Sequence, residues 1–396
     1  MILASGLSDR PIAERDNQTP LQIADTPNLD RMAQAGYAGS VQTIPESLEP
    51  NNQVSFLSLL GYDPEKYAGG NAHFEAIGLD VQMSPEEIPL CCDFVNLQSS
   101  HNDMIMKDYT ADQLSSDSAK ILLDGLQKNI SDPPVRFFAG NGPHNLMVIK
   151  SQPLTGPLTP PEELIGEGIR KFMPEGKEFE DLVYVMNQAQ IILHNHKFNR
   201  ALQAEGLDTV NSIWLSGNGP AVKLPDVSEV HGKSVCVVTA SVLLKGMAKA
   251  AGMKVAEVEG TTGFSNSNFP GKVEATLKEL ESQDVVVLHI GAAEEVSLKG
   301  GFDDKILAIE DFDSLVLGPI MEALEERKDV KILLTVNHGC SAVLMKYNRD
   351  HVPFLVTPSA KSNGSRKKFD EQLNDNHDSH YSSGQALIHD FLGDNI

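Results

Sequence analysis

The chain has 396 residues, of which 41% are hydrophobic and 6% aromatic, and its formal net charge is -23. This length predicts two domains, and the acidic balance disfavours nucleic acid, anionic membrane surfaces and, without a local basic pocket, anionic substrates. No apolar run approaches the roughly 20 residues of a spanning helix, and no signal peptide is visible. The four cysteines follow no disulfide or metal spacing, so we expect a cytoplasmic protein.

The N-terminal part begins with a short apolar strand, MILA, and the sequence leaves open whether residues upstream of Met1 are missing. Residues 26–36, TPNLDRMAQAG, predict a helix with Thr26 as its N-cap and Gly36 as its stop. The next stretch, PNNQVSFLSLLGYDP at 50–64, indicates a helix end followed by a Gly turn and a Pro.

The middle of the chain, residues 82–225, differs in composition from its flanks. It carries polar strands, Pro-rich breaks and one long helical region around 180–205. We interpret it as an inserted second domain, and we assign residues 1–81 and 226–396 to one discontinuous core domain.

The C-terminal part contains five apolar runs that are rich in Val, Ile and Leu and are separated by helical stretches. Such runs are typical of buried parallel strands with crossover helices. They are residues 233–240, 253–258, 284–290, 330–336 and 352–357. The segment 361–384 is polar and is expected to form a loop before a last short helix.

A parallel sheet places function in the loops beyond the carboxyl ends of its strands. Here these loops are residues 5–11, 291–295 and 337–339. They offer one histidine, a pair of glutamates and several neutral polar groups, whereas a two-metal site needs several carboxylates.

Seven segments, in order along nearly the whole chain, resemble the archaeal-type cofactor-independent phosphoglycerate mutase family of the alkaline phosphatase superfamily. They are SGLSDRP, TPLQIADTPNLDRMAQAG, LSLLGYDP, GGNAHFEAIGL, NSIWLSGNG, HIGAAEE and LTVNHG. The resemblance implies an α/β fold, with an alkaline-phosphatase-like, doubly wound, mostly parallel sheet and an inserted smaller α+β domain. It also implies two manganese or zinc ions and a serine that carries the phosphoryl group between the two hydroxyls of phosphoglycerate.

Carried over residue by residue, the family's nucleophile and metal ligands are mostly replaced. The nucleophile position holds Asn52, the Asp of DGLGDRP is Ser5, and the Asp and His of HIKAPDEAGHDGD are Glu294 and Leu298. The Asp and His of TADH are Asn337 and His338, and a further ligand histidine falls on Tyr347.

These replacements remove the chemistry that the family uses. A carboxamide is not a nucleophile, so Asn52 cannot form a phospho-enzyme. Leu298 cannot coordinate a metal, and Tyr347 is a poor ligand at neutral pH. We therefore expect no catalytic residue, no metal and no cofactor at these positions.

The family's phosphate-binding arginines and lysines are also mostly absent, although guanidinium groups suit phosphate oxygens best. Only Lys107 and His144 remain from these segments. The other family positions hold Asn71, Asn145, Leu202, Ser216 and Gly291.

Several other polar residues are expected to have structural rather than catalytic roles. Asp9 and Arg10 are expected to hold a loop by hydrogen bonds, and Ser55 and Ser58 lie at the wrong helical phase to replace a nucleophile at position 52. The pairs His194/His196 and His377/His380 are expected to be polar-loop histidines, because no third ligand is placed beside them.

Three hypotheses follow. The first is a degenerate family member with a binding, regulatory or structural role, as a homo-oligomer or with an active relative. The second is an enzyme with other chemistry around His338, Glu294 and Glu295. The third is a working mutase whose site is misaligned, which the anchors LSLLGYDP and LTVNHG disfavour.

Overall fold

The computed structural model describes residues 1–358, 368–375, 379–393 and 395–396. The chain divides into two compact units. The first comprises Met1–Ala68, Lys223–Ala240 and Ala248–Ile396, and the second comprises Gly69–Val222 and Ser241–Met247. The sequence placed the inserted domain at 82–225, so the compact unit starts earlier than that prediction and takes in one later segment.

The first unit contains a sheet of eight described strands in the order β15-β2-β14-β11-β1-β10-β8-β9. The strands are β1 (Ile2–Ala4), β2 (Tyr37–Val41), β8 (Val235–Val238), β9 (Lys254–Ala256), β10 (Val285–Ile290), β11 (Ile332–Thr335), β14 (Val352–Thr357) and β15 (His380–Tyr381). The central strands pair in parallel, so the predicted α/β fold with a mostly parallel sheet is confirmed. The expectation that 352–357 is parallel is wrong, because β14 pairs antiparallel with both β11 and β2.

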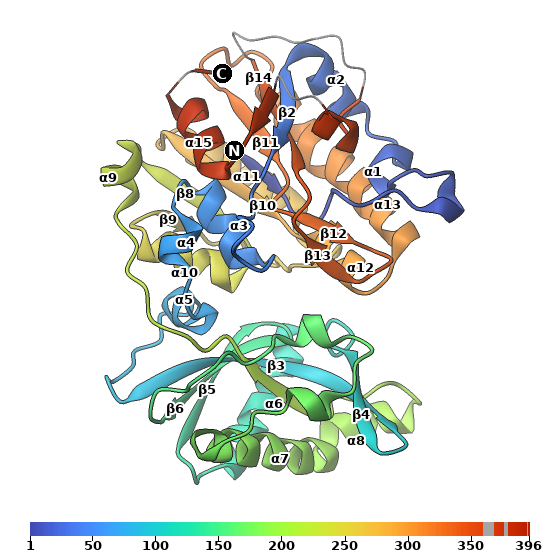
Figure 1. The fold of residues 1–396 in the computed structure, drawn as a ribbon, viewed down its shortest axis with the longest axis vertical. Coiled ribbons are helices and arrows are strands. Elements are labelled where there is room, and N and C mark those ends of the chain that lie inside the picture. The colour runs from blue at the N-terminus through green and yellow to red at the C-terminus, as the bar shows by residue number, and fades with distance from the viewer. Residues whose placement is uncertain (359–367, 376–378, 394) are drawn as a thin grey trace. The chain divides into compact units, whose positions relative to one another are not determined.

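Apolar side chains from the parallel strands and from the surrounding helices form the core of this unit. In Figure 1, α1, α2 and α13 lie on one side of the sheet, and α3, α4 and α15 lie on the other. The α-helices are α1 (Pro20–Ile23), α2 (Pro27–Ala35), α3 (Asn52–Leu59), α4 (Pro64–Tyr67), α9 (Val227–His231), α11 (Phe269–Glu279), α12 (Ala292–Leu298), α13 (Phe302–Asp311), α14 (Gly318–Ala323) and α15 (Gly384–Leu392). Helix α10 (Val242–Ala250) crosses the division between the units.

Short elements complete the first unit. A hairpin of β12 (Gly339–Ser341) and β13 (Lys346–Asn348) leaves the sheet after β11. A π-helical segment, η5 (Phe312–Leu317), joins α13 to α14, and η1 (Ala13–Arg15) and η6 (Glu371–Asp375) are 3-10 turns. Because η6 and β15 form within 361–384, that segment is more ordered, where the structure describes it, than the loop that the sequence predicted.

Helix α2 begins at the predicted place, but a distant carboxylate caps it. Thr26 occupies the N-cap position and makes no side-chain capping bond. Asp313 in η5 instead accepts hydrogen bonds from the backbone N–H of Asn28 at 3.1 Å and of Leu29 at 2.8 Å. Since free N–H groups at a helix start need acceptors, this contact fixes α2 against η5.

The second unit contains an antiparallel sheet in the order β4-β3-β6-β5, with β7 also pairing with β3. Its strands are β3 (Glu87–Ser100), β4 (Asp103–Asp108), β5 (Val135–Asn141), β6 (His144–Lys150) and β7 (Ser212–Ser216). Its helices are α5 (Asn71–Gly78), α6 (Ser116–Asn129), α7 (Glu180–Asn195), α8 (Lys197–Ala204) and the short turns η2 (Pro161–Leu164), η3 (Ile169–Phe172) and η4 (Lys177–Phe179).

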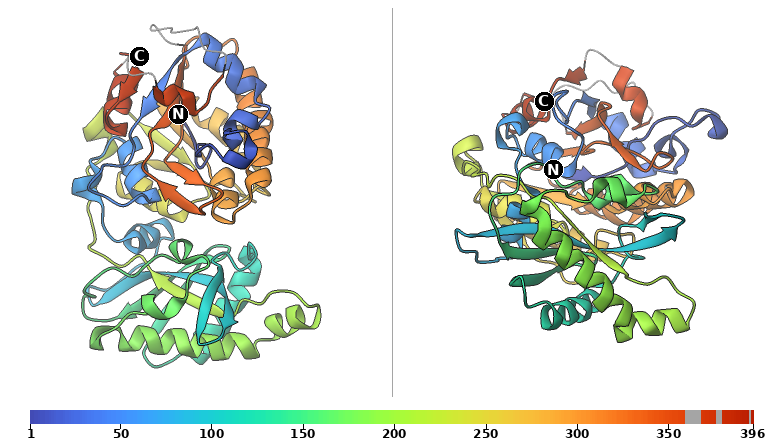
Figure 2. Two further views of the ribbon diagram at one scale, coloured as in Figure 1. Left: turned by 45° about the vertical axis from the view of Figure 1, so that its right-hand side comes forward. Right: turned by 60° about the horizontal axis from the view of Figure 1, so that its bottom comes forward.

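The helices of the second unit cover its sheet. Helices α6 and α7 contact each other and the strands β5 and β7, and Figure 2 shows them from two further directions. The predicted helical region around 180–205 is two helices, because the chain is extended at His196, whose ring accepts a bond from the backbone N–H of Phe198. In the described part of the chain, no helix is long and apolar enough to cross a membrane.

Candidate functional site

Five of the seven predicted site positions meet at the carboxyl edge of the first unit's sheet. Glu294 lies in α12 after β10, and Asn337 and His338 follow β11. Asn52 is the first residue of α3, and Tyr347 lies in β13 of the hairpin. Because β11, β1 and β10 are neighbours in the sheet, the loops that follow them converge as the parallel pattern predicts.

A helix cap and a glycine in the loop after β1 help to place these site residues. The Asn51 side chain caps α3 by accepting from the backbone N–H of Val54 at 2.9 Å, which makes Asn52 the first helical residue. Gly6 has a φ of 78°, and a Cβ there would lie 2.3 Å from the backbone of Glu294. Only glycine therefore allows the loop after β1 to approach α12 so closely.

Glu294 is the centre of a buried hydrogen-bond network. Its side chain is 4% exposed. Oε1 accepts from Asn52 Nδ2 at 2.7 Å and from the Tyr347 hydroxyl at 2.9 Å, and Oε2 accepts from Asn337 Nδ2 at 3.1 Å. Three donors from three different segments thus surround one carboxylate, and hydrogen bonds to a charged group are the stronger kind.

The two asparagines also bond to each other, and His338 lies beside both. Asn337 Nδ2 donates to Asn52 Oδ1 at 2.8 Å. His338 Nε2 lies 3.3 Å from Asn52 Oδ1 and 3.2 Å from Asn337 Nδ2. Burial lowers the pKa of His338 although Glu294 acts in the opposite direction, so the ring is neutral near pH 7.

The remaining two positions do not join this network. Leu298 is 2% exposed and packs in the interior. Ser5 Oγ lies 3.0 Å from His289 Nε2, and the Thr239 hydroxyl lies 2.9 Å from His289 Nδ1. His289 is not among the predicted site residues, and the signal that could have found it is its place as the one polar residue inside the apolar run of β10.

The Ser5–His289–Thr239 array resembles a nucleophile, base and orienting group, but its electrostatics do not suit that role. Burial, with a contribution from Lys272, lowers the pKa of His289 to about 3. A general base works best with a pKa near the working pH. Ser5 is also 1% exposed, so a substrate cannot reach it. The array therefore serves the structure.

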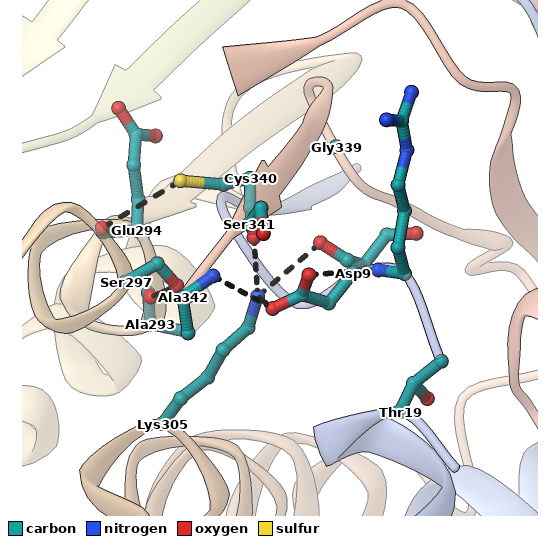
Figure 3. A network of polar contacts seen from close by, with 12 residues as sticks. Asp9, Thr19, Ala293, Glu294, Ser297, Lys305, Gly339, Cys340, Ser341 and Ala342 are labelled. Carbon is teal, nitrogen blue, oxygen red and sulfur yellow. Dashed lines mark hydrogen bonds and ion pairs between the residues drawn. The ribbon is translucent and has the colours of Figure 1, made fainter. Parts of the chain in front are cut away.

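Asp9 lies in a second buried network that holds the loop after β1. Its Oδ2 accepts from Lys305 Nζ at 2.9 Å and from the backbone N–H of Ala342 at 2.9 Å. Lys305 also donates to the Cys340 carbonyl at 2.6 Å. Figure 3 shows these contacts, with the Glu294 side chain pointing away from Lys305.

Arg10 and the two candidate serines have structural partners. Arg10 pairs with Asp350 on the surface at 2.5 and 2.9 Å, so the loop-holding interpretation of Asp9 and Arg10 is confirmed. Ser55 Oγ donates to the Asn52 carbonyl, and Ser58 Oγ accepts from the backbone N–H of Gly384. Both hydroxyls are therefore bonded to the backbone of their surroundings.

The family's substrate-binding positions lie mostly in the second unit, where each has its own local environment. Lys107 pairs with Asp208 at 2.5 Å, and His144 Nδ1 lies 2.8 Å from Asp93 Oδ1. Asn145 is buried and donates to the carbonyls of Gly142 and Pro143. Of the remaining positions, half-buried Asn71 opens α5, half-buried Leu202 lies in α8, buried Ser216 ends β7, and Gly291 precedes α12 in the first unit.

The surroundings of His144 are acidic rather than basic. Burial and the nearby Asp93 raise the pKa of Glu75 to about 7 and the pKa of Glu162 to about 8. Ionised carboxyl groups repel phosphate oxygens, whereas arginine guanidinium groups bind them. The acidic side chains around His144 therefore do not favour phosphate binding.

The remaining histidine candidates lie in several different elements. His194 lies in α7 and His380 in β15, so the expectation of polar-loop histidines is wrong for these two, and His196 caps α8. His380 stacks on His351 with ring centroids 4.4 Å apart, and His377 lies outside the described residues. Over the residues that the structure describes, no group of three or more His, Cys, Asp or Glu side chains is placed to hold a metal ion.

Comparison with known proteins places these features in a family. The family model of 2,3-bisphosphoglycerate-independent phosphoglycerate mutase matches residues 33–199. A probable enzyme of this kind from Geobacter sulfurreducens is 34% identical over 373 residues, which cover 94% of both chains. The enzyme from Methanosarcina mazei is 35% identical over 375 residues, with the same coverage. The chain belongs to this phosphoglycerate mutase family.

Solved structures support the fold. A protein from Pyrococcus horikoshii aligns with a TM-score of 0.74 at 24% identity, covering 99% of this chain and 96% of its own. The cofactor-independent phosphoglycerate mutase of Thermoplasma acidophilum aligns with a TM-score of 0.54 at 24% identity, covering 99% and 97%. The family consists of isomerases related to glycolysis, and this chain has the family's architecture.

The mutase family implies divalent metal ions at the edge where Glu294 lies, and the residues present do not fit them. Two divalent ions need several negative ligands, whereas Glu294 is the only carboxylate in this network and both its oxygens already accept hydrogen bonds. Within the described part of the chain, Asn337 Oδ1 is buried without a hydrogen-bond partner, and one amide oxygen does not replace a carboxylate. The absence of bound metal remains a prediction.

Proposed function

We propose that this member of the phosphoglycerate mutase family has lost the mutase reaction and is retained for a binding, regulatory or structural role. A second copy of the chain or an active family member is the candidate partner. The net charge of -23 argues against nucleic acid and anionic membranes as partners.

The observation that carries this proposal is the state of Asn52. It occupies the nucleophile position, and its amide is bonded to Glu294 at 2.7 Å and to Asn337 at 2.8 Å. A carboxamide cannot attack a phosphoryl group, and here both of its ends are used within the protein. The lost phosphate-binding residues of the second unit support the same proposal.

The second hypothesis, other chemistry around His338, Glu294 and Glu295, has less support. His338 is fully buried, with a pKa lowered by that burial, and Glu294 is shielded by three donors. A general base must reach the proton that it removes. The third hypothesis, an active mutase, requires a nucleophile, but the Ser55 hydroxyl donates to the backbone carbonyl of Asn52 and the Ser58 hydroxyl is bonded to Gly384.

Metal content tests the proposal first. The purified protein, incubated with manganese and zinc and then desalted, should contain no stoichiometric divalent metal by elemental analysis. Roughly two ions per chain, lost when His338 and Glu294 are substituted, would contradict the degenerate site.

Activity and phosphorylation test it second. A coupled assay with enolase and added manganese should stay at background, with an active relative of the family as the positive control. Mass spectrometry should find no phosphopeptide within residues 46–66 after incubation with 3-phosphoglycerate. Turnover above background, or such a phosphopeptide, would move the active-mutase hypothesis to the front.

A further inference from the structure

The hairpin β12–β13 is attached to the first unit at two levels. At the first level, buried Lys305 donates to the Cys340 carbonyl, and the backbone N–H of Ala342 donates to Asp9. The Cys340 carbonyl and the Ala342 N–H both belong to the β12 side of the hairpin, as Figure 3 shows. These two hydrogen bonds hold the start of the hairpin, and other contacts hold its second strand, β13.

At the second level, Tyr347 holds β13. Its hydroxyl donates to Glu294 Oε1 at 2.9 Å, and its ring centroid lies 4.3 Å from that of His338. The same Glu294 carboxylate accepts from Asn52 at the start of α3 and from Asn337 after β11. One carboxylate thus joins its own helix α12 to the start of α3, to the end of β11 and to β13.

A metal centre performs the same mechanical task, because ligands from separate segments bind one ion and cross-link them. Here the ligand positions hold donors that point at a single anion instead of acceptors that point at a cation. Hydrogen bonds to an ionised carboxylate are about twice as strong as neutral ones. Three of them offset the cost of burying that charge, which would be severe without partners.

We propose that Glu294 and Tyr347 form a latch that closes the β12–β13 hairpin over this edge without any metal ion. The proposal rests on the proposed loss of the metal site. The latch adds a side-chain anchor for β13 to its backbone pairing with β12. Just beyond the strand, Arg349 donates to the Leu48 carbonyl and Asp350 pairs with Arg10.

Hydrogen exchange of a peptide covering residues 339–348 tests the latch. Tyr347→Phe removes only the hydroxyl, and we expect exchange in this peptide to become about tenfold faster because a bond to a charged acceptor is lost. Tyr381→Phe is the matched control, since the Tyr381 hydroxyl donates to Asp390 at the same distance of 2.9 Å in the same unit. The control should leave the rate of the 339–348 peptide unchanged.

Glu294→Gln is the second variant. It removes the charge and places its amide nitrogen against at least one of the three donors, so it should also speed exchange in this peptide. In the wild type, manganese and a chelator should each leave the exchange rate of this peptide unchanged.

The latch is overturned if Tyr347→Phe and Tyr381→Phe have equal effects on the peptide, or if manganese slows its exchange in the wild type. A wild type that is inactive and metal-free while Tyr347→Phe has no effect would remove the latch and leave the proposed function intact. A wild type that binds metal and turns over phosphoglycerate would remove the proposed function instead.

Discussion

The predicted metal-ligand positions at the edge of the first unit's sheet and the predicted substrate positions of the second unit differ in how their polar side chains are bonded. At the edge, Asn52, Asn337 and Tyr347 all bond to Glu294. In the second unit, Lys107 and His144 each have a separate acidic partner.

Under the proposed loss of the metal site, this difference has a physical reason. A metal ion cross-links its ligands, so without it several buried polar groups must find partners in one another. A substrate leaves and returns, so residues that bind it must be stable without it. The proposal therefore implies collective replacement at the edge and separate replacements in the second unit.

We expect the largest effect when the aspartate of the family pattern is restored at position 337, within the hydrogen-bond network around Glu294. Asn337→Asp removes the donor that lies 3.1 Å from Glu294 and places a second carboxylate beside it. We expect a loss of stability on the order of 3 kcal/mol, because a buried charge without a partner is costly. Urea unfolding at pH 7 measures it. In a Glu294→Gln background the same change should cost clearly less, and equal costs in both backgrounds would show that the two side chains do not interact.

The stability of the second unit should depend on pH because of two glutamates, Glu75 and Glu162, that lie outside the network around Glu294. The pKa of Glu75 is raised from 4.5 to about 7, and that of Glu162 from 4.5 to about 8. The folded state therefore holds these protons more tightly than the unfolded state. Their contribution to stability is complete below about pH 4.5 and is lost as the pH rises toward 8. Urea midpoints of wild type and Glu162→Gln from pH 5 to 8.5 measure it. The variant should show a shallower decline, and identical slopes would exclude Glu162 as a cause.

Substituting Lys107 in the second unit should change the stability of the protein only slightly, because Lys107 pairs with a single partner, Asp208. Lys107 and Asp208 are 41% and 55% exposed, so Lys107→Ala should cost no more than about 1 kcal/mol. Thermal unfolding measures the change, and the hydrogen exchange of β6 around His144 should stay the same. A loss of several kcal/mol would indicate that the positions of the second unit also form one network.

The smallest expected effect is on activity after partial repair. Asn52→Ser, and the triple variant with Ser5→Asp and Asn337→Asp, should both remain at background in the enolase-coupled assay. Catalytic groups that act as a unit are strongly non-additive, and Leu298 and Tyr347 remain among the ligand positions. The assay is read on protein shown to be folded. A thermal shift of the wild type by 3-phosphoglycerate that requires manganese would show that the pocket still binds its family substrate.

The sequence predicted the fold class and the convergence at the sheet edge, because buried parallel strands have a distinctive apolar pattern and a fixed polarity. It did not predict the direction of β14, since an apolar run reads alike in either direction. It also gave no sign that Asp313 caps α2 or that His289 engages Ser5. Such partners are chosen by the folded arrangement across more than 280 residues, and no local pattern encodes that choice.

The position of β1 at the centre of its sheet has a consequence for how the chain is made. Residues 2–4 pair with β10 at Leu288–Ile290 and with β11 at Leu334–Thr335. On the ribosome, at about 5–20 residues per second, roughly 15 to 70 seconds pass before these partners have been synthesised. During that interval the strand is an apolar segment without its pairing partners, so this part of the nascent chain needs protection from aggregation for a long time.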